Sequence, residues 1–367
     1  MCIRVYLWKI EFLIGIIIYL YINYYMGVRH LNTLLKTNAP NGITKLHINK
    51  LSNRVVAIDT SIYLYRYKTC NGAMPNNKDN GLSGLIENMY LMISIFKKYN
   101  ITPIFVFDGT PPAEKNALLE IRKQKKAAAE ARWHDLRGQL KSSELDDDKR
   151  FDIISAMNKE RSKFVRIHKE DINEVKKLME VYGVSYVDAE GEADILCARL
   201  VESGEAYGCL SEDMDMFVYG TTRVFRYLSL VNLTVVEYNL PYILKQLDVT
   251  FNEFKEVCVL SGTDYNNNNN NNNNICRILK LLYKYKKSMK NLTIQPGDFI
   301  NWLINNSYCS NLNITEYNTA LDMFNLDNCK QEYNINSPKT DAYNKDNLRQ
   351  FMTRYGFIYP KGLCKRS

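Results

Sequence analysis

Short apolar runs that end in a carboxylate are the feature that most limits what this chain can fold into. One run covers 54–60 and holds Asp59, and a second covers 102–109 and holds Asp108. Continuous apolar runs of this length are typical of strands buried on both faces, as in a parallel sheet covered by helices. Two more strands are predicted at 184–187 and 206–210, and helices at 85–99, 170–182 and 192–203. This alternation predicts an open α/β domain.

The composition is that of an ordinary globular protein. Of 367 residues, 46% are apolar and 24% are charged, which argues against a wholly disordered, collagenous or multi-pass membrane protein. The formal net charge of +8 is a mild basic bias, compatible with a nucleic-acid partner. Nine cysteines without a C-x-x-C pair indicate free thiols in a reducing, intracellular compartment, and they exclude zinc-ribbon and c-type haem sites.

Carboxylates recur just after the predicted strands. Beyond the two already named, they are Glu192, Asp194, Asp213 and Asp215. Ligands of open α/β sheets bind outside the carboxyl ends of the strands, so these acids are expected to converge in one crevice. Converging carboxylates repel one another and need cations, and oxygen ligands favour Mg²⁺ or Mn²⁺. A single Asp after a strand is as often a helix cap or turn residue, but capping does not explain the paired acids.

A long charged stretch follows Asp108. Lys115 and Arg122 are seven residues apart, which places them two turns apart on one face of a helix. Residues 127–132 have high helix propensity but lack the broad apolar face of a packed helix. Such a charge run is usually a solvated helix face. Because this one begins beside a candidate active-site acid, it would also hold nucleic-acid phosphates.

Six short motifs stand in a fixed order between residues 26 and 265. They are M-G-V-R-H-L at 26–31, V-A-I-D-T-S at 56–61, V-F-D-G-T-P-P at 106–112, E-A-D at 192–194, S-E-D-M-D at 211–215 and G-T-D-Y at 262–265. In this order the chain resembles the flap endonuclease/XPG family of structure-specific 5′ nucleases. The similarity continues more weakly at 278–282 and 348–352.

The resemblance implies a site for two divalent metal ions, Mg²⁺ or Mn²⁺, roughly 4 Å apart, that would hydrolyse DNA phosphodiester bonds and leave a 5′-phosphate. The first ion would be held by Asp59, Asp108, Glu192 and Asp194, and the second by Asp213, Asp215 and Asp264, with Asp194 shared. No Ser or His nucleophile is needed for this chemistry.

The resemblance also implies roles for four other residues. Lys115 and Arg122 match two basic family residues that contact the scissile phosphate. Tyr65 matches an aromatic residue that stacks on a base near the cut, although a Tyr on an amphipathic helix needs no such role. Gly27, exposed after removal of Met26, would lie close to the active site.

The fold that this resemblance implies is the PIN-like 5′ nuclease fold, with a mostly parallel central sheet flanked by helices. The expected organisation is an apolar extension at 1–25, a nuclease domain at 26–240 with a helical arch at about 111–168, and a C-terminal helical region at 241–367 that carries a degenerate helix-hairpin motif.

The chain departs from the family pattern in three places. Asp194 stands where the family has Glu, which shortens one metal ligand by a methylene. The Asn tract at 266–274 replaces a Gly-x-Gly hairpin, so K⁺ binding and the grip on downstream duplex DNA are left open. No motif of the form Q-x-x-[LIM]-x-x-aromatic-aromatic for a sliding clamp is present.

The leading hypothesis is a Mg²⁺-dependent flap endonuclease and 5′ exonuclease in DNA replication, repair or recombination, acting as a monomer on branched or flapped DNA. One alternative is a relative that cuts four-way junctions or RNA. Another is a catalytically silent nucleic-acid-binding protein. The presence of a carboxylate at all seven acidic positions argues against this alternative. The Asn tract suggests an AT-rich genome, such as that of a large DNA virus. The expected location is the nucleus of a cell or the site of viral DNA replication.

The first 25 residues contain an apolar run of 14 residues, from Phe12 to Tyr25. A membrane-spanning helix needs about 20 apolar residues, so a membrane anchor is the less favoured interpretation. In the resembled family, an extension at Gly27 would leave the fold through the substrate cleft beside the acids, where it would obstruct DNA.

We therefore expect the working protein to begin at Gly27, with residues 1–25 absent, removed or disordered. Intact-mass analysis of the native protein tests this, and a fully active species that starts at Met1 or Cys2 would contradict it. In a parallel comparison of chains that begin at Met1 and at Met26, the shorter chain is expected to be at least as soluble and more active.

Overall fold

A computed structural model describes residues 27–71, 81–140, 146–265, 274–289, 298–309, 312–328, 333–336 and 344–357. The apolar extension at 1–25, Met26 and the Asn tract from 266 to 273 lie outside the described residues, so the interpretations given to them stay predictions. None of the helices within the described ranges combines the length and the hydropathy needed to cross a membrane.

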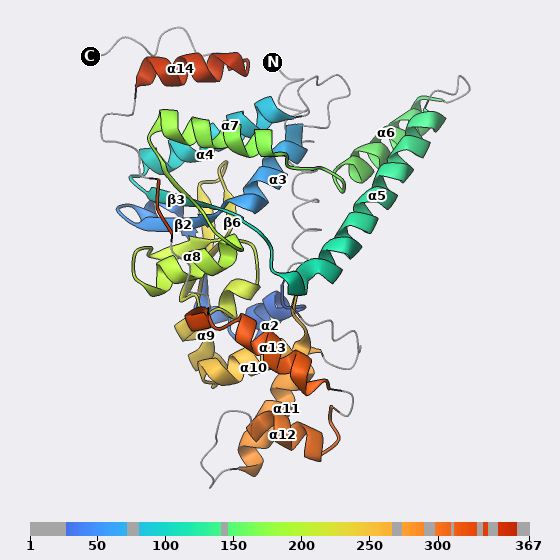
Figure 1. The fold of residues 1–367 in the computed structure, drawn as a ribbon, viewed down its shortest axis with the longest axis vertical. Coiled ribbons are helices and arrows are strands. Elements are labelled where there is room, and N and C mark those ends of the chain that lie inside the picture. Colours follow the sequence, from blue (N-terminus) through green and yellow to red (C-terminus); the bar gives the residue numbers. More distant parts are fainter. Residues whose placement is uncertain are drawn as a thin grey trace.

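The centre of the fold is one seven-stranded sheet in the order β1-β7-β6-β5-β2-β3-β4 (Figure 1). Its strands are Ile43–His47 (β1), Val55–Asp59 (β2), Thr102–Phe107 (β3), Ser185–Asp188 (β4), Gly208–Leu210 (β5), Arg223–Ser229 (β6) and Thr234–Asn239 (β7). Strands β6, β5, β2, β3 and β4 are parallel to one another, whereas β7 pairs antiparallel with both β6 and β1. The predicted α/β fold with a mostly parallel sheet is confirmed.

Side chains of the central strands alternate between two apolar cores, one on each face of the sheet. In β3, Phe105 and Phe107 belong to one core, while Ile104 and Val106 belong to the other. The first core is covered by α3 (Thr60–Asn71), α4 (Leu82–Lys98) and α7 (Lys169–Tyr182), and the second by α2 (Leu31–Asn38) and α8 (Ala193–Glu202). Burial on both faces explains why β2 and β3 read as continuous apolar runs.

Two long helices between β3 and α7 project from the body of the molecule (Figure 1). They are α5 (Asn116–Gln139), which follows the short 3₁₀ turn Ala113–Lys115, and α6 (Asp147–Arg161). Both lie within the predicted arch at 111–168. No residue of α6 is buried, and exposed ion pairs such as Arg132–Glu160 join it to α5. Exposed pairs of this kind contribute little stability.

The C-terminal part of the chain is helical. Helices α9 (Leu240–Leu247), α10 (Phe251–Ser261), α11 (Ile275–Ser288), α12 (Asp298–Asn305) and α13 (Ile314–Met323) extend the core that α2 and α8 cover. The last helix, α14 (Lys345–Arg354), departs from this group. It packs against α7 on the opposite face of the sheet, where Leu348, Phe351 and Met352 are buried.

Candidate active site

The predicted acids follow the carboxyl ends of the parallel strands. Asp59 is the last residue of β2, and Asp108 comes directly after β3. Glu192 is the N-cap of α8, just beyond β4, while Asp213 and Asp215 follow β5. Because these strands are parallel, their carboxyl ends share one edge of the sheet, and the acids lie along that edge.

Ser211 links the acid that follows β2 to those that follow β5. Its hydroxyl donates to Asp59 Oδ2 at 3.0 Å and accepts from the backbone N–H of Asp213 at 3.1 Å. Asp213 Oδ1 in turn accepts from the backbone N–H of Asp215 at 2.9 Å. The sequence places Ser211 inside a motif but assigns it no role, and only the fold brings it to Asp59, 152 residues away.

Asp108 is held by two donors. The hydroxyl of Ser61 donates to its Oδ2, and the backbone N–H of Ala193 donates to its Oδ1 at 2.8 Å. The second bond places this carboxylate at the N-terminus of α8, where the helix dipole favours negative charge. Asp108 thus caps a helix, as a single Asp after a strand often does. The helix it caps is α8, which comes much later in the chain, and not the helix that follows β3.

Burial and mutual repulsion raise the pKa values of the buried carboxyls of Asp59, Asp194, Asp213 and Asp215. Burial first, and then the charges of Asp108 and Asp213, raise the pKa of Asp59 to about 8. Burial together with Asp59 and Asp213 raises that of Asp194, and burial together with Asp264 raises that of Asp213. Groups that perturb one another in this way lie in one shared electrostatic field. The repulsion within this field is relieved where a cation or a proton sits among the carboxylates.

Burial also raises the pKa of Asp215, with Asp213 and Asp264 adding to the effect. Among the side chains that the structure describes, three carboxylate oxygens of the site are buried without a hydrogen-bond partner: Asp194 Oδ1 and both oxygens of Asp215. A buried acceptor without a donor is costly, so these oxygens are positioned for a ligand that supplies positive charge.

The two predicted phosphate contacts pair with carboxylates of the site. Lys115 Nζ lies 2.7 Å from Glu192 Oε1, and an Arg122 Nη lies 2.9 Å from Asp264 Oδ2. Burial alone would lower the pKa of Lys115, but Glu192 and Asp215 outweigh it and raise that pKa above its ordinary value. In this arrangement no three His, Cys, Asp or Glu side chains within the described ranges form a ready metal-binding group. The chain's own cations engage two of the predicted ligands instead.

Tyr265 is a site residue to which the sequence assigns no function. Its hydroxyl donates to Glu192 Oε2 at 2.7 Å, and Lys115 Nζ lies 4.7 Å from the centre of its ring. Its position directly after Asp264, in the last motif, is the signal that could have singled it out. It holds one carboxylate oxygen of Glu192, and Lys115 holds the other.

Tyr65 lies on α3, beneath the arch helix α5. Lys126 Nζ is 5.0 Å from the centre of its ring, an attractive cation–π distance. Burial and the charge of Asp108 raise its pKa, while Arg122 opposes this. The structure therefore places Tyr65 between the acids and the basic face of the arch.

Gly27 packs against the acids. A Cβ atom at this position would stand 2.3 Å from Asp213 Oδ1 and 2.7 Å from Asp215 Oδ1. Its φ of 69° is also in the left-handed region that favours glycine. The first described residue of the chain is thus in contact with the site, and no larger side chain fits there.

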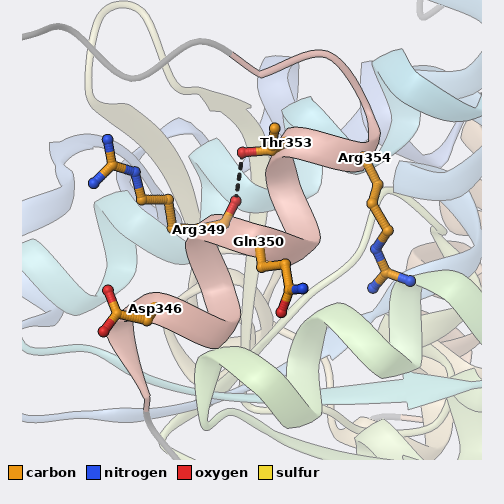
Figure 2. A pocket seen from close by; sticks show the side chains of 5 residues that line it. All are labelled: Asp346, Arg349, Gln350, Thr353 and Arg354. Atoms are coloured by element: carbon orange, nitrogen blue, oxygen red, sulfur yellow. Dashed lines mark hydrogen bonds between the residues drawn. The ribbon is translucent and has the colours of Figure 1, made fainter.

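A separate hollow lies on α14, away from the acids (Figure 2). It is lined by Asp346, Arg349, Gln350, Thr353 and Arg354. The Thr353 hydroxyl donates to the Arg349 carbonyl at 2.7 Å, which is an ordinary contact within one helix. This hollow gathers none of the predicted site residues, whereas the acid edge gathers buried carboxylates without partners. We therefore place the candidate active site at the acid edge.

Comparison with known proteins decides the family. Residues 26–129 match the family model of the XPG N-terminal domain, and residues 183–264 match that of the XPG I-region. The flap endonuclease 1 of Encephalitozoon cuniculi is 33% identical over 246 residues, which are 65% of this chain and 68% of that protein. The chain belongs to the flap endonuclease/XPG family. The flap endonuclease 1 of Chlamydomonas reinhardtii is 31% identical, and the chain spans 59% of that protein's length.

Solved structures of this family have the same fold. The catalytic core of Rad2 in complex with DNA substrate has a TM-score of 0.55 at 20% identity, covering 88% of this chain and 94% of that one. Human GEN1 in complex with Holliday junction DNA also has a TM-score of 0.55, at 18% identity and with 90% and 72% covered. Flap endonuclease-1 from Methanococcus jannaschii has a TM-score of 0.51 at 20% identity, with 85% and 95% covered.

Gly109 joins the loop that carries Asp108 to the loop that carries Glu192. A larger residue at this position is therefore expected to lower stability. The Gly109 N–H donates to the Gly191 carbonyl at 2.7 Å, and a Cβ on Gly109 would stand 2.1 Å from the Ala189 carbonyl oxygen. Gly109→Ala is expected to lower the free energy of unfolding by about 1–3 kcal/mol, because the backbone must shift to admit the methyl group.

Urea denaturation measures this change. Gly138→Ala is the matched control, because a Cβ there meets nothing within 4 Å and the residue lies in α5. The control is expected to be neutral or stabilising by up to about 1 kcal/mol. Equal stability of the two variants would show that the contact at Gly109 does not constrain the loops.

Proposed function

We propose that this chain is a structure-specific 5′ nuclease that uses Mg²⁺ or Mn²⁺ to hydrolyse phosphodiester bonds in flapped or branched DNA. The observation that carries the proposal is the set of buried carboxylate oxygens without partners on Asp194 and Asp215. They lie at the sheet edge beside Lys115 and Arg122, at the start of the projecting arch. Family membership supports a nuclease, and the metal dependence and the individual residue roles are our inference.

The donor set fits two divalent cations. Seven carboxylates supply hard oxygen ligands, as Mg²⁺ and Mn²⁺ prefer. One ion would be held by Asp59, Asp108, Glu192 and Asp194, and the second by Asp213, Asp215 and Asp264, with Asp194 shared. Bound there, the ions would polarise the phosphate and activate a water. The shorter Asp194 is compatible with this arrangement, since its Oδ1 is buried and has no hydrogen-bond partner.

Lys115 and Arg122 have a second role in the proposal. Cations bound to Glu192 and Asp264 would compete with these two side chains for the carboxylates. Lys115 and Arg122 would then be free to contact the scissile phosphate, where they would stabilise the charge that develops during cleavage. Arg122 can turn readily, because its side chain is 41% exposed. Tyr65, between this face and Asp108, offers a ring on which a base adjacent to the cut can stack.

The proposal extends to the setting in which the chain acts. Cys197, Cys209, Cys258, Cys276 and Cys309 are free thiols, which supports a reducing compartment. We propose a monomer acting in the nucleus, or at the site of viral DNA replication if the chain is viral. No clamp and no K⁺ ion enter the proposal. A cleavage assay with Mg²⁺ on labelled flap, nicked, bubble and four-way DNA, together with the same flap in RNA, establishes the preferred substrate.

Removal of a metal ligand is expected to abolish cleavage. Asp213→Ala should lower the single-turnover rate on a 5′ flap by about 10³-fold or more, equivalent to ~4 kcal/mol of transition-state stabilisation, while DNA affinity stays nearly unchanged. The measurement is a Mg²⁺ titration of the rate. Asp152→Ala, an exposed acid on α6, is the control. A variant of Asp213 that cuts near the wild-type rate would show that the two-metal assignment is wrong.

Loss of either basic residue is expected to slow cleavage more than it weakens binding. Lys115→Ala and Arg122→Ala should each lower the single-turnover rate by about 10²–10³-fold, because they act on charge in the transition state. Rates and dissociation constants are measured on the same flap. Lys123→Ala is the matched control, since that side chain is 79% exposed on the same helix. Equal losses of rate and affinity would make Lys115 and Arg122 ordinary members of a basic patch.

A further inference from the structure

Helix α3 touches three parts of the molecule that the proposed function brings together. Near its start, Ser61 donates a hydrogen bond to Asp108 of the acid edge. One turn later, Tyr65 packs its ring against Lys126 of the arch helix α5. Three residues further on, Lys68 pairs with Asp171 at the start of α7. Positions 65 and 68 are neighbours on one face of a helix, so these contacts follow one side of α3.

The third contact is a buried ion pair. Lys68 Nζ lies 2.5 Å from Asp171 Oδ2, and the two side chains are only 5% and 7% exposed. The same oxygen of Asp171 accepts the backbone N–H of His168 at 2.6 Å, which closes the capping box of α7. The pair is therefore joined to the backbone of the segment that enters α7.

The Lys68–Asp171 pair lies where the arch segment rejoins the body of the protein. His168 is the last residue of the arch segment 111–168, so Asp171 holds the point where the arch returns to the body. At the other end of the arch, Lys115 is held by Glu192. Between these two ends the ion pair Arg132–Glu160, whose arginine is exposed, joins the described arch helices, and such a pair contributes little stability. The arch is thus fixed at two ends, one at the acids and one at Lys68.

Stability alone is a poor reason for such a pair. The cost of removing two charges from water often exceeds their attraction, and apolar residues of similar volume are frequently as stable or more so. A buried ion pair does, however, fix one relative position of the two elements it joins, because each charge requires its own partner. A misplacement of about 1 Å at a reacting group costs as much as 10²-fold in rate.

We propose that the Lys68–Asp171 ion pair is a positioning device that fixes the return end of the arch over Tyr65 and the acid edge. This inference rests on the proposed nuclease function and deepens it. Lys68 and Asp171 act through α3 and the arch, without touching the reacting atoms. The pair sets where Arg122 and Lys126 stand when a DNA strand lies beneath the arch.

The test is the double variant Lys68→Met/Asp171→Asn, which removes both charges and keeps side-chain volume and an acceptor for the His168 N–H. We expect its melting temperature to be at or above that of the wild type, and its single-turnover rate on a 5′ flap to fall by about 10-fold or more. The dissociation constant for the same DNA should stay within about twofold. A role in stability alone would instead lower the melting temperature and leave the rate unchanged.

Lys177→Met is the matched control, because that lysine lies on α7 in an exposed pair with Glu174. It should cleave like the wild type. A double variant that folds and cleaves within twofold of the wild type overturns the inference. If the wild type and the control fail to cleave any of the DNA or RNA substrates, the proposed function is wrong.

Hydrogen exchange of the unmodified chain decides the inference without any cleavage or variant. If the return end of the arch is fixed, the hydrogen-bonded amides of His168, Asp171 and Ile172 are expected to exchange slowly, at rates close to those of the buried strand β3. Exchange there as fast as in α6, which buries none of its residues, would overturn the inference even if the double variant did not fold.

Discussion

The structure depends on keeping a group of like charges together at one buried edge. Parallel strands deliver carboxylates to that edge from four separate places in the chain, and burial makes their repulsion strong. Many of the described polar contacts around the edge counter this repulsion. Backbone N–H groups, the hydroxyl of Ser211, Lys115 and Arg122 all direct positive charge or a donor hydrogen at a carboxylate. The geometry of the site follows from this requirement.

The loop after β5, which carries Asp213 and Asp215, is supported by polar contacts deep in the core. Arg226 of β6 is completely buried, donates to the Glu212 carbonyl at 2.8 Å, and lies 3.5 Å from the Glu212 carboxylate. The backbone of Tyr227, which has a positive φ of 58°, donates to that carboxylate at 2.7 Å. A buried arginine and a strained residue thus support the turn that presents Asp213 and Asp215. Such strain persists only where the surroundings over-determine it.

Sequence patterns predicted the strands that are apolar on both faces, and missed strands in which apolar and polar or charged residues are mixed. Strands β2 and β3 are apolar on both faces and were predicted. Strand β6 was missed because Arg226 interrupts its apolar run, and the short, partly exposed β1 gave little signal. The acids were predicted from their motifs, and the family was confirmed. The contact of Lys115 with Glu192 spans 77 residues and follows from the fold alone, as does the role of Tyr265.

The position of α14 has a consequence for how the chain is made. Its buried residues Leu348, Phe351 and Met352 complete the same core as Leu178 and Met179 of α7. During synthesis, α3, α4 and α7 are available early to cover that face of the sheet, but α14 follows the last strand by more than a hundred residues. The opposite core closes progressively with α9 to α13. The core beneath α3, α4 and α7 is therefore the later of the two to be completed, and the apolar surface of α7 that α14 covers stays exposed longest in the nascent chain.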